Sequence, residues 1–395
     1  MGRTVAVIAA VFALVPTGTA LASSWAAAEI KTVTSVGLMG TKTPTTFRPN
    51  ATLTNQALAN LVFGLKQLLA PAPAPAPVVP PPAPTPDPTV TDTTQTTTTV
   101  ATTTTVATTT TAATTTVSSP VPAPPAQPPK VQNGAAAATM TMLDAELVDG
   151  VGLSEAASEF VHGANAAGLD VPARFGTEVA ARLLGLRIDH PASEDPIELL
   201  LGDPATRAEA AYSAAQILHS SGWLVPVVQG LADSFSLPQY SVWQRRIIDA
   251  AVARIGMPYV WGGTSDDREI DFGVPARGGY DCSGFVWRVY KLTRYPGERT
   301  LASVLRGRTT YVMSGEVPRS ELIDFDHLQP ADVIFFGKRG PRSSPSQVDH
   351  MAIYLGNGWL IQSSDYGVAL ARLDGWYRHE FAWGRRPLRE AGLAG

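Results

Sequence analysis

A cysteine stands at the start of a predicted amphipathic helix in the sequence Asp281-Cys-Ser-Gly-Phe-Val-Trp-Arg-Val-Tyr-Lys-Leu292. The buried side of this helix is predicted from the apolar residues at helical spacing, Phe285, Val286, Val289 and Tyr290. A helix N-terminus offers free N–H groups and the positive end of the helix dipole, which stabilise a thiolate and lower the pKa of a thiol. Cys282 is the single cysteine in a chain of 395 residues and cannot form an internal disulfide. The segment therefore predicts a reactive thiol.

A histidine and an amide follow on two predicted strands. His350 begins a strand that runs into the turn Gly356-Asn-Gly358, and the chain returns over residues 359–364. Gln362 lies on the returning strand, so it can sit beside His350. A nucleophile, a base and an orienting polar group thus come from a helix start and two adjacent strands, as in papain-like thiol proteases. We expect Cys282 to be the nucleophile, His350 the general base and Gln362 the orienting group.

Four motifs occur in a fixed order between about Ser241 and Leu388. They are Pro258-Tyr-Val-Trp-Gly-Gly263, Asp281-Cys-Ser-Gly284, Leu328-Gln-Pro-Ala-Asp-Val-Ile-Phe-Phe336 and the stretch from His350 to Gly358. Together they resemble the successive motifs of NlpC/P60 peptidases. The resemblance implies a papain-like α+β fold, with N-terminal helices packed on an antiparallel sheet. It also implies cleavage of peptidoglycan stem peptides, typically between D-γ-glutamate and the diamino acid.

The resemblance assigns further roles around the thiol. Tyr259 would point its hydroxyl toward Cys282, and Asp281 and Ser283 would hold the polar end of the substrate. The chain departs from the family at the third catalytic position, where Gln362 stands in place of a frequent His.

Other departures lie outside the catalytic positions. Ala331 replaces a usual Gly, which we expect to be a small change. The long stretches 264–280 and 338–347 are expected to border the cleft and narrow the choice of substrate.

The chain divides into five predicted segments. Residues 1–22 read as a signal peptide, because Arg3, an apolar run and Ala20-Leu-Ala22 follow the order that signal peptidase requires. This predicts a secreted or cell-wall location. Residues 71–130 are rich in Pro and Thr and predict a disordered linker. Residues 241–390 are the predicted catalytic domain, whose first helix is capped by Ser241.

Two predicted helical segments, 23–70 and 131–240, flank the linker. Thr54 is a predicted N-cap, Thr206 and Glu209 predict a capping box, and residues 168–185 around Thr177 read as a weaker third copy. These sequence motifs resemble S-layer homology repeats, which bind cell-wall polysaccharide. The alternative is a helical packing domain without a ligand.

Composition excludes several classes of function. The net charge is −4, only 16% of residues are charged, and no basic stripe favours a nucleic-acid partner. No segment predicts a stable membrane span. The acidic residues between 266 and 271 lack the spacing of a calcium loop, and the His and acid spacings fit no zinc site. We therefore expect no metal and no cofactor.

The expected function is a secreted cysteine endopeptidase that hydrolyses peptidoglycan stem peptides through a thioacyl-enzyme. Its expected partners are peptidoglycan or muropeptides, with wall polysaccharide as a partner of the N-terminal repeats. One alternative is an N-acetylmuramoyl-L-alanine amidase. Another is a wall-binding protein whose peptidase domain is catalytically weak, which the Gln at position 362 favours.

Overall fold

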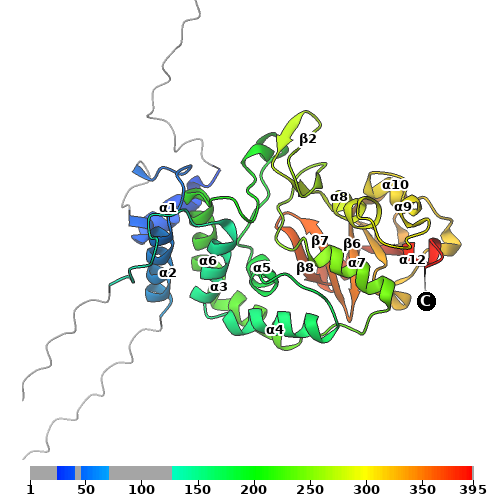
Figure 1. Ribbon diagram of the computed structural model, residues 1–395, viewed down its shortest axis with the longest axis horizontal. Helices are drawn as coiled ribbons and strands as arrows, with labels where there is room; N and C mark the ends of the chain where they lie inside the picture. The colour runs from blue at the N-terminus through cyan, green and yellow to red at the C-terminus, as the bar shows by residue number, and fades with distance from the viewer. Residues whose placement is uncertain (1–24, 41–45, 71–126, 394–395) are drawn as a thin grey trace, which may run out of the picture. The chain divides into compact units, whose positions relative to one another are not determined.

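A computed structural model describes residues 25–40, 46–70 and 127–393 of the chain (Figure 1). The predicted signal peptide and most of the predicted linker, residues 71–126, lie outside the described residues. Residues 1–69 and 128–395 belong to one unit, and residues 70–127 belong to a second. All the elements below are part of the first unit.

The part of the chain before residue 241 is helical. Its elements are α1 (Ala27–Ser35), η1 (Leu38–Gly40), α2 (Asn55–Leu69), α3 (Met140–Gly150), α4 (Ser154–Ala166), α5 (Phe175–Leu183), η3 (Ala192–Ile197) and α6 (Arg207–Asp233). Helix α2 buries Leu58, Leu61, Val62 and Leu65. These recur every three or four residues and form one apolar stripe.

Three of these helices start from a shared ring of backbone hydrogen bonds. Leu53 N–H donates to Ala205 O at 2.8 Å, Ala205 N–H donates to Ala138 O at 2.8 Å, and Ala138 N–H donates to Leu53 O at 2.9 Å. The next residue in each case is Thr54, Thr139 or Thr206. Each threonine hydroxyl accepts a backbone N–H three residues on, at 3.2 Å. The helices α2, α3 and α6 therefore begin as three equivalent copies of one motif.

Two predictions about this region are corrected by the structure. The third copy begins at Thr139, and the predicted copy at Thr177 is wrong because Thr177 lies inside the first turn of α5. The capping box at Thr206 is only half formed. The side chain of Glu209 is buried in the helical part instead, where burial raises the pKa of its carboxyl and the charge of Arg187 only partly opposes that rise.

The part of the chain from residue 241 onward carries the sheet. Helix α7 (Val242–Val252) starts at Ser241 with a complete capping box, as expected. A five-stranded antiparallel sheet follows, in the order β8-β7-β6-β5-β9. Its strands are β5 (Val333–Gly337), β6 (Val348–Gly356), β7 (Trp359–Ser364), β8 (Gly367–Arg372) and β9 (Phe381–Arg385).

Short elements fill the connections of this part. Two small hairpins pair β1 (Thr264–Ser265) with β4 (Gly279–Tyr280), and β2 (Glu269–Asp271) with β3 (Val274–Ala276). The helical elements are α8 (Cys282–Trp287), η4 (Arg288–Leu292), α9 (Leu301–Val304), α10 (Thr310–Ser314), η5 (Arg319–Glu321), η6 (Phe325–His327), η7 (Gly340–Arg342), η8 (Pro345–Gln347), α11 (Gly375–Glu380) and α12 (Pro387–Glu390).

Helix α8 packs on β6 and β7 (Figure 1). The strands alternate between two apolar faces, since Phe335 and Met351 belong to the main core whereas Ile334 and Ala352 belong to a smaller cluster. The four residues predicted as the buried side of the cysteine helix are all buried. The predicted α+β fold, with helices packed on an antiparallel sheet, is confirmed.

The helical part and the sheet share one core. The ring of Trp359 on β7 lies 5.0 Å from that of Phe235 and 6.2 Å from that of Phe160, both edge-on. Arg182 on α5 is buried and donates to Asp144, Glu178 and the carbonyl of Gly256, at 3.2, 2.8 and 2.8 Å. Within the described residues, no helix has the length and apolarity needed to cross a bilayer.

Arg182→Ala is expected to lower the free energy of unfolding by about 3–5 kcal/mol, because it leaves two buried carboxylates without their cation. The measurement is urea unfolding at pH 8, above the pKa of about 7 to which burial raises Glu178. Lys66→Ala is the control. It removes an exposed ion pair with Asp149 and should cost less than about 1 kcal/mol. Equal effects of the two substitutions would contradict the buried network.

Candidate active site

Cys282 is the first residue of α8, as the sequence predicts. Asp281 is the N-cap, and its carboxylate accepts the backbone N–H of Gly284. A Cβ on Gly284 would lie 1.8 Å from the carbonyl oxygen of Gly263. The helix start therefore rests directly on the turn after Tyr259, and only glycine fits at position 284.

The carboxylate of Asp281 joins three further groups. It accepts from the backbone N–H of Gly262 at 3.0 Å, the hydroxyl of Ser283 at 2.9 Å and the guanidinium of Arg308 at 3.2 Å. Ser283 is buried and also accepts from Arg308 at 2.7 Å. The two residues predicted to hold substrate are therefore bonded to each other and to Arg308. Sequence reasoning missed this arginine, which stands just before Thr310 in the chain.

The thiol of Cys282 lies between α10 and β6. Its sulfur is 3.3 Å from the hydroxyl oxygen of Thr310, and the backbone N–H of Met351 points to it. Burial and the charge of Asp281 raise the pKa of the thiol to about 11. The predicted lowering of this pKa is wrong. Loss of water and a neighbouring carboxylate outweigh the helix dipole.

The imidazole of His350 is held by Gln362. Its Nε2 lies 2.6 Å from the amide oxygen of Gln362. An amide oxygen can only accept, so Nε2 carries the hydrogen and Nδ1 keeps a free lone pair. Burial lowers the pKa of His350, so the ring is neutral at pH 7.

Tyr377 on α11 completes this chain of contacts and was not predicted. The amide nitrogen of Gln362 donates to its hydroxyl, which fixes the orientation of the amide. The ring of Tyr377 packs edge-on against Phe336, at 5.3 Å. No sequence motif marked this residue, because it lies after the last recognised motif.

Tyr259 lies beside the thiol. Its backbone forms an isolated β-bridge with that of Tyr280. Burial raises the pKa of its hydroxyl, and the charges of Cys282 and Asp281 raise this pKa further. The charge of Asp189, from the helical part, acts on Tyr259 as well. The backbone N–H of Asp189 donates to Asp365 O at 2.7 Å, so the helical part reaches the edge of the site.

The acidic residues of the stretch before Asp281 have structural partners. Asp266 pairs with Arg254 at 3.0 Å and with Arg288 at 2.8 Å. Glu269 accepts the backbone N–H of Thr264 at 2.7 Å. Among the described residues, no group of three or more His, Cys, Asp or Glu side chains is arranged to hold a metal ion.

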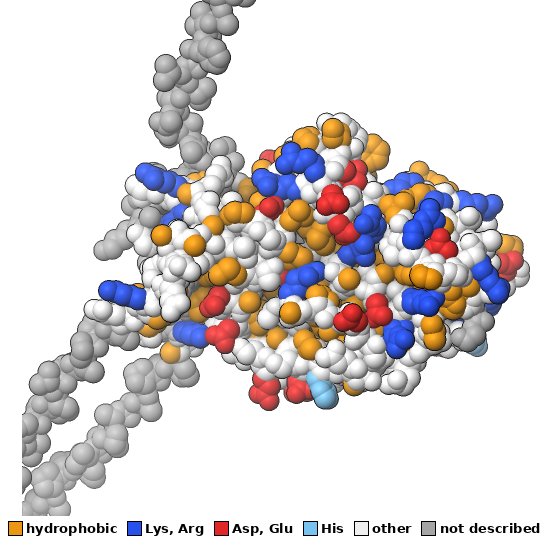
Figure 2. Space-filling model, in the orientation of Figure 1, with side chains coloured by type: hydrophobic (Ala, Val, Ile, Leu, Met, Phe, Trp, Pro, Cys, Tyr) orange, Lys and Arg blue, Asp and Glu red, His pale blue; other side chains and the backbone are white. Residues whose placement is uncertain are grey.

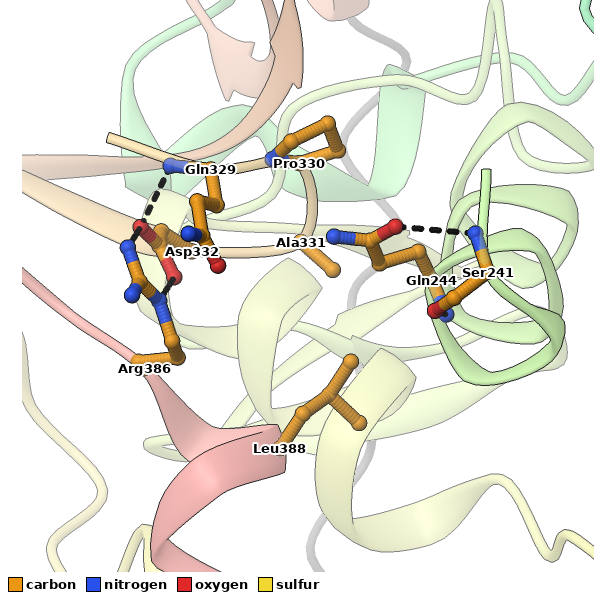
Figure 3. A pocket seen from close by; sticks show the side chains of 8 residues that line it. All are labelled: Ser241, Gln244, Gln329, Pro330, Ala331, Asp332, Arg386 and Leu388. Atoms are coloured by element: carbon orange, nitrogen blue, oxygen red, sulfur yellow. Dashed lines mark hydrogen bonds and ion pairs between the residues drawn. The ribbon is translucent and has the colours of Figure 1, made fainter. Parts of the chain in front are cut away.

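A cavity of about 330 Å³ lies at the start of α7 and contains none of the predicted catalytic residues (Figure 3). Its polar side chains largely pair with each other. Arg386 binds Asp332 at 2.8 and 2.9 Å, and Gln244 accepts the backbone N–H of Ser241 at 2.9 Å. The cavity therefore reads as a product of helix capping and ion pairing.

The arrangement of a thiol, a neutral imidazole with a free Nδ1 and an orienting amide suits nucleophilic acyl transfer. Residues 256–386 match the NlpC/P60 family. They form an NlpC/P60 domain. This region contains Cys282, His350, Gln362 and Tyr377.

Known proteins resemble the chain over this region. The peptidoglycan endopeptidase RipA of Mycobacterium tuberculosis is 29% identical over 44% of this chain and 36% of its own. The gamma-D-glutamyl-L-lysine dipeptidyl-peptidase of Bacillus cereus is 32% identical over 36% of each chain. A crystal structure of an NlpC/P60 family protein from Bacillus cereus gives a TM-score of 0.28, with 27% identity over 39% of this chain and 42% of that one. The chain spans about a third of the length of these two curated relatives.

Alkylation of Cys282 by iodoacetamide should keep rising with pH toward the thiol pKa of about 11. At pH 7 a thiol of that pKa is ionised in about one molecule in 10⁴, against about 3 in 100 for an ordinary cysteine. The rate is measured by mass spectrometry, with the urea-unfolded chain as control. A plateau at or below neutral pH would mean that the resting state is a Cys282–His350 ion pair.

Gln362→Glu should raise the pKa of His350 by about 1 or more, because it sets a carboxylate against Nε2. The pKa is measured by NMR titration of the imidazole. Gln347→Glu is the matched control, since it adds the same charge at an exposed position three residues before His350. A His350 pKa that does not respond to Gln362→Glu would contradict the hydrogen bond between the two side chains.

Proposed function

We propose that this protein is a cysteine endopeptidase that hydrolyses peptidoglycan stem peptides. The observation that carries the proposal is the set of contacts from Cys282 to Thr310 and Met351, and from His350 to Gln362. The names of the relatives support it, since one is a peptidoglycan endopeptidase and another a gamma-D-glutamyl-L-lysine dipeptidyl-peptidase.

The reaction begins from a neutral thiol and a neutral imidazole. Substrate binding expels water, and His350 Nδ1 takes the thiol proton as the sulfur of Cys282 attacks the scissile carbonyl carbon. The imidazolium then gives its proton to the leaving amine, and a thioester remains on Cys282. His350 next takes a proton from water, which attacks the thioester carbonyl. The C–S bond then breaks, the acid product leaves, and the sulfur of Cys282 takes the proton back from the imidazolium. Gln362 accepts from Nε2–H throughout and keeps the ring in the required tautomer.

The scissile bond we propose joins D-γ-glutamate to the diamino acid. The peptidase named for a gamma-D-glutamyl bond favours this choice. We place the reaction outside the cytoplasm, in the cell wall, on the signal-like sequence of residues 1–22. For the helical part we propose wall polysaccharide as ligand, which the repeated Thr54, Thr139 and Thr206 motif supports.

The amidase alternative has the same nucleophile and differs in the bond that is cut. The alternative of a weak wall-binding protein rests on Gln362 in place of a frequent His. The hydrogen bond from His350 Nε2 to the amide oxygen of Gln362 argues against this alternative. An amide oxygen can accept the hydrogen of the neutral ring, so Gln362 can orient His350 as a His at this position would.

Purified peptidoglycan should yield new fragments that end at D-glutamate when it is digested with the full chain. Cys282→Ala should yield none, because removal of the nucleophile stops acyl transfer. Products are read by mass spectrometry.

Each alternative predicts its own outcome. Free stem peptides that begin with L-alanine would favour the amidase. No products from either chain, with both chains sedimenting with the wall, would replace the proposal by the wall-binding function.

A further inference from the structure

A second cavity, of about 460 Å³, lies between the end of α10 and the loop that carries η7 and η8. Three arginines line it, Arg319, Arg339 and Arg342, and no Asp or Glu does. The indole of Trp383, which is nearly buried, is also part of the lining. We call this set of residues the arginine cavity. On the face drawn in Figure 2, Lys and Arg side chains lie among Asp and Glu side chains over α9, α10 and α12.

The guanidinium groups of these three arginines form no hydrogen bond or ion pair with any residue that the structure describes. Other arginines of the same domain behave differently, because Arg385 pairs with Glu316 and Glu390, and Arg386 pairs with Asp332. Three like charges around one cavity repel each other, and an anion bound among them would relieve the repulsion. Guanidinium groups also bind carboxylates with two parallel hydrogen bonds.

The arginine cavity lies close to the catalytic groups along two elements. Ser314, on its wall, is four residues after Thr310 on α10, which is about 6 Å along a helix. Gln347, also on its wall, is three residues before His350, which is at most about 10 Å of extended chain. A peptide bound at the thiol would therefore reach the cavity within about three residues.

The cavity and Tyr259 mark two directions away from the thiol. Tyr259 and Asp281 lie on the turn in front of α8, whereas the arginine cavity lies beyond α10 and before β6. The carboxylate of Asp281, next to Tyr259, is already paired with Arg308, whereas the three arginines of the cavity have no partner among the described residues. Only the end of a bound peptide that reaches the arginine cavity therefore meets unpaired charge.

We propose that the arginine cavity binds the carboxylate at the C-terminal end of the stem peptide, on the leaving-group side of the scissile bond. This rests on the proposed function and adds the substrate feature that the site selects. A stem peptide with a free C-terminal carboxylate is preferred over one whose C-terminus is amidated or cross-linked, because only the free C-terminus supplies an anion at that end of the peptide, whereas the α-carboxylate of D-glutamate is present in both.

The test is calorimetric binding to the full chain carrying Cys282→Ala, which cannot turn over the ligand. The probes are the synthetic tetrapeptide L-Ala-γ-D-Glu-L-Lys-D-Ala and its C-terminal amide. Arg339→Gln together with Arg342→Gln should weaken binding of the acid about tenfold or more and leave binding of the amide unchanged. Lys338→Gln is the matched control, since it removes a positive charge from the same loop without lining the cavity. It should bind both peptides as the parent does.

Equal loss for acid and amide, no loss for either, or no binding of the tetrapeptide to the parent would overturn the inference. Displacement of the tetrapeptide by glycerol phosphate at equal concentration would also overturn it, because the cavity would then suit a wall phosphodiester. Cleavage of the amide by the chain with Cys282 intact separates the two ideas. With cleavage but no discrimination only the inference fails, and with discrimination but no cleavage only the proposed peptidase fails.

Discussion

The carboxylate of Asp281 is the contact on which the geometry around the thiol depends. It caps α8, binds the turn at Gly262, and holds Arg308 two residues before Thr310. Three segments that are distant in sequence therefore meet at one charged group. The cost is electrostatic, because the same carboxylate destabilises a thiolate at Cys282. The contacts of Asp281 thus fix the position of Cys282, and they also contribute to the higher pKa of its thiol.

His350, the proposed base, is arranged in a way that suits this neutral thiol. The side chain of Gln362 is uncharged, so it orients His350 without favouring the protonated form of the ring. The half-buried imidazole and the half-buried thiol both favour their uncharged forms, because each has lost water. In the proposed reaction, charge separation then belongs to the step in which the substrate is attacked. Tyr377 holds the amide of Gln362 on the side away from His350, so His350, Gln362 and Tyr377 form one chain of hydrogen bonds.

Much of this could be read from the sequence, because Cys282, His350 and Gln362 lie in local patterns that fix a helix start and a hairpin. Tyr377 and Arg308 could not, since each acts through a contact made only in the folded chain. The thiol pKa was misjudged because burial is not visible in a motif. Ala331 was underrated as well. Its φ of 67° lies in the left-handed region, where a side chain costs about 1–2 kcal/mol and glycine is free.

The ring of hydrogen bonds through Leu53, Ala138 and Ala205 joins chain segments on both sides of residues 71–126. Gln56 adds to it, because its amide nitrogen donates to Pro129 O at 2.8 Å across 73 positions. The first segment is thus attached by packing as well as by the peptide bond. A protease that cuts between residues 71 and 126 would leave two polypeptides that stay associated. Maturation by nicking could then occur without loss of either piece.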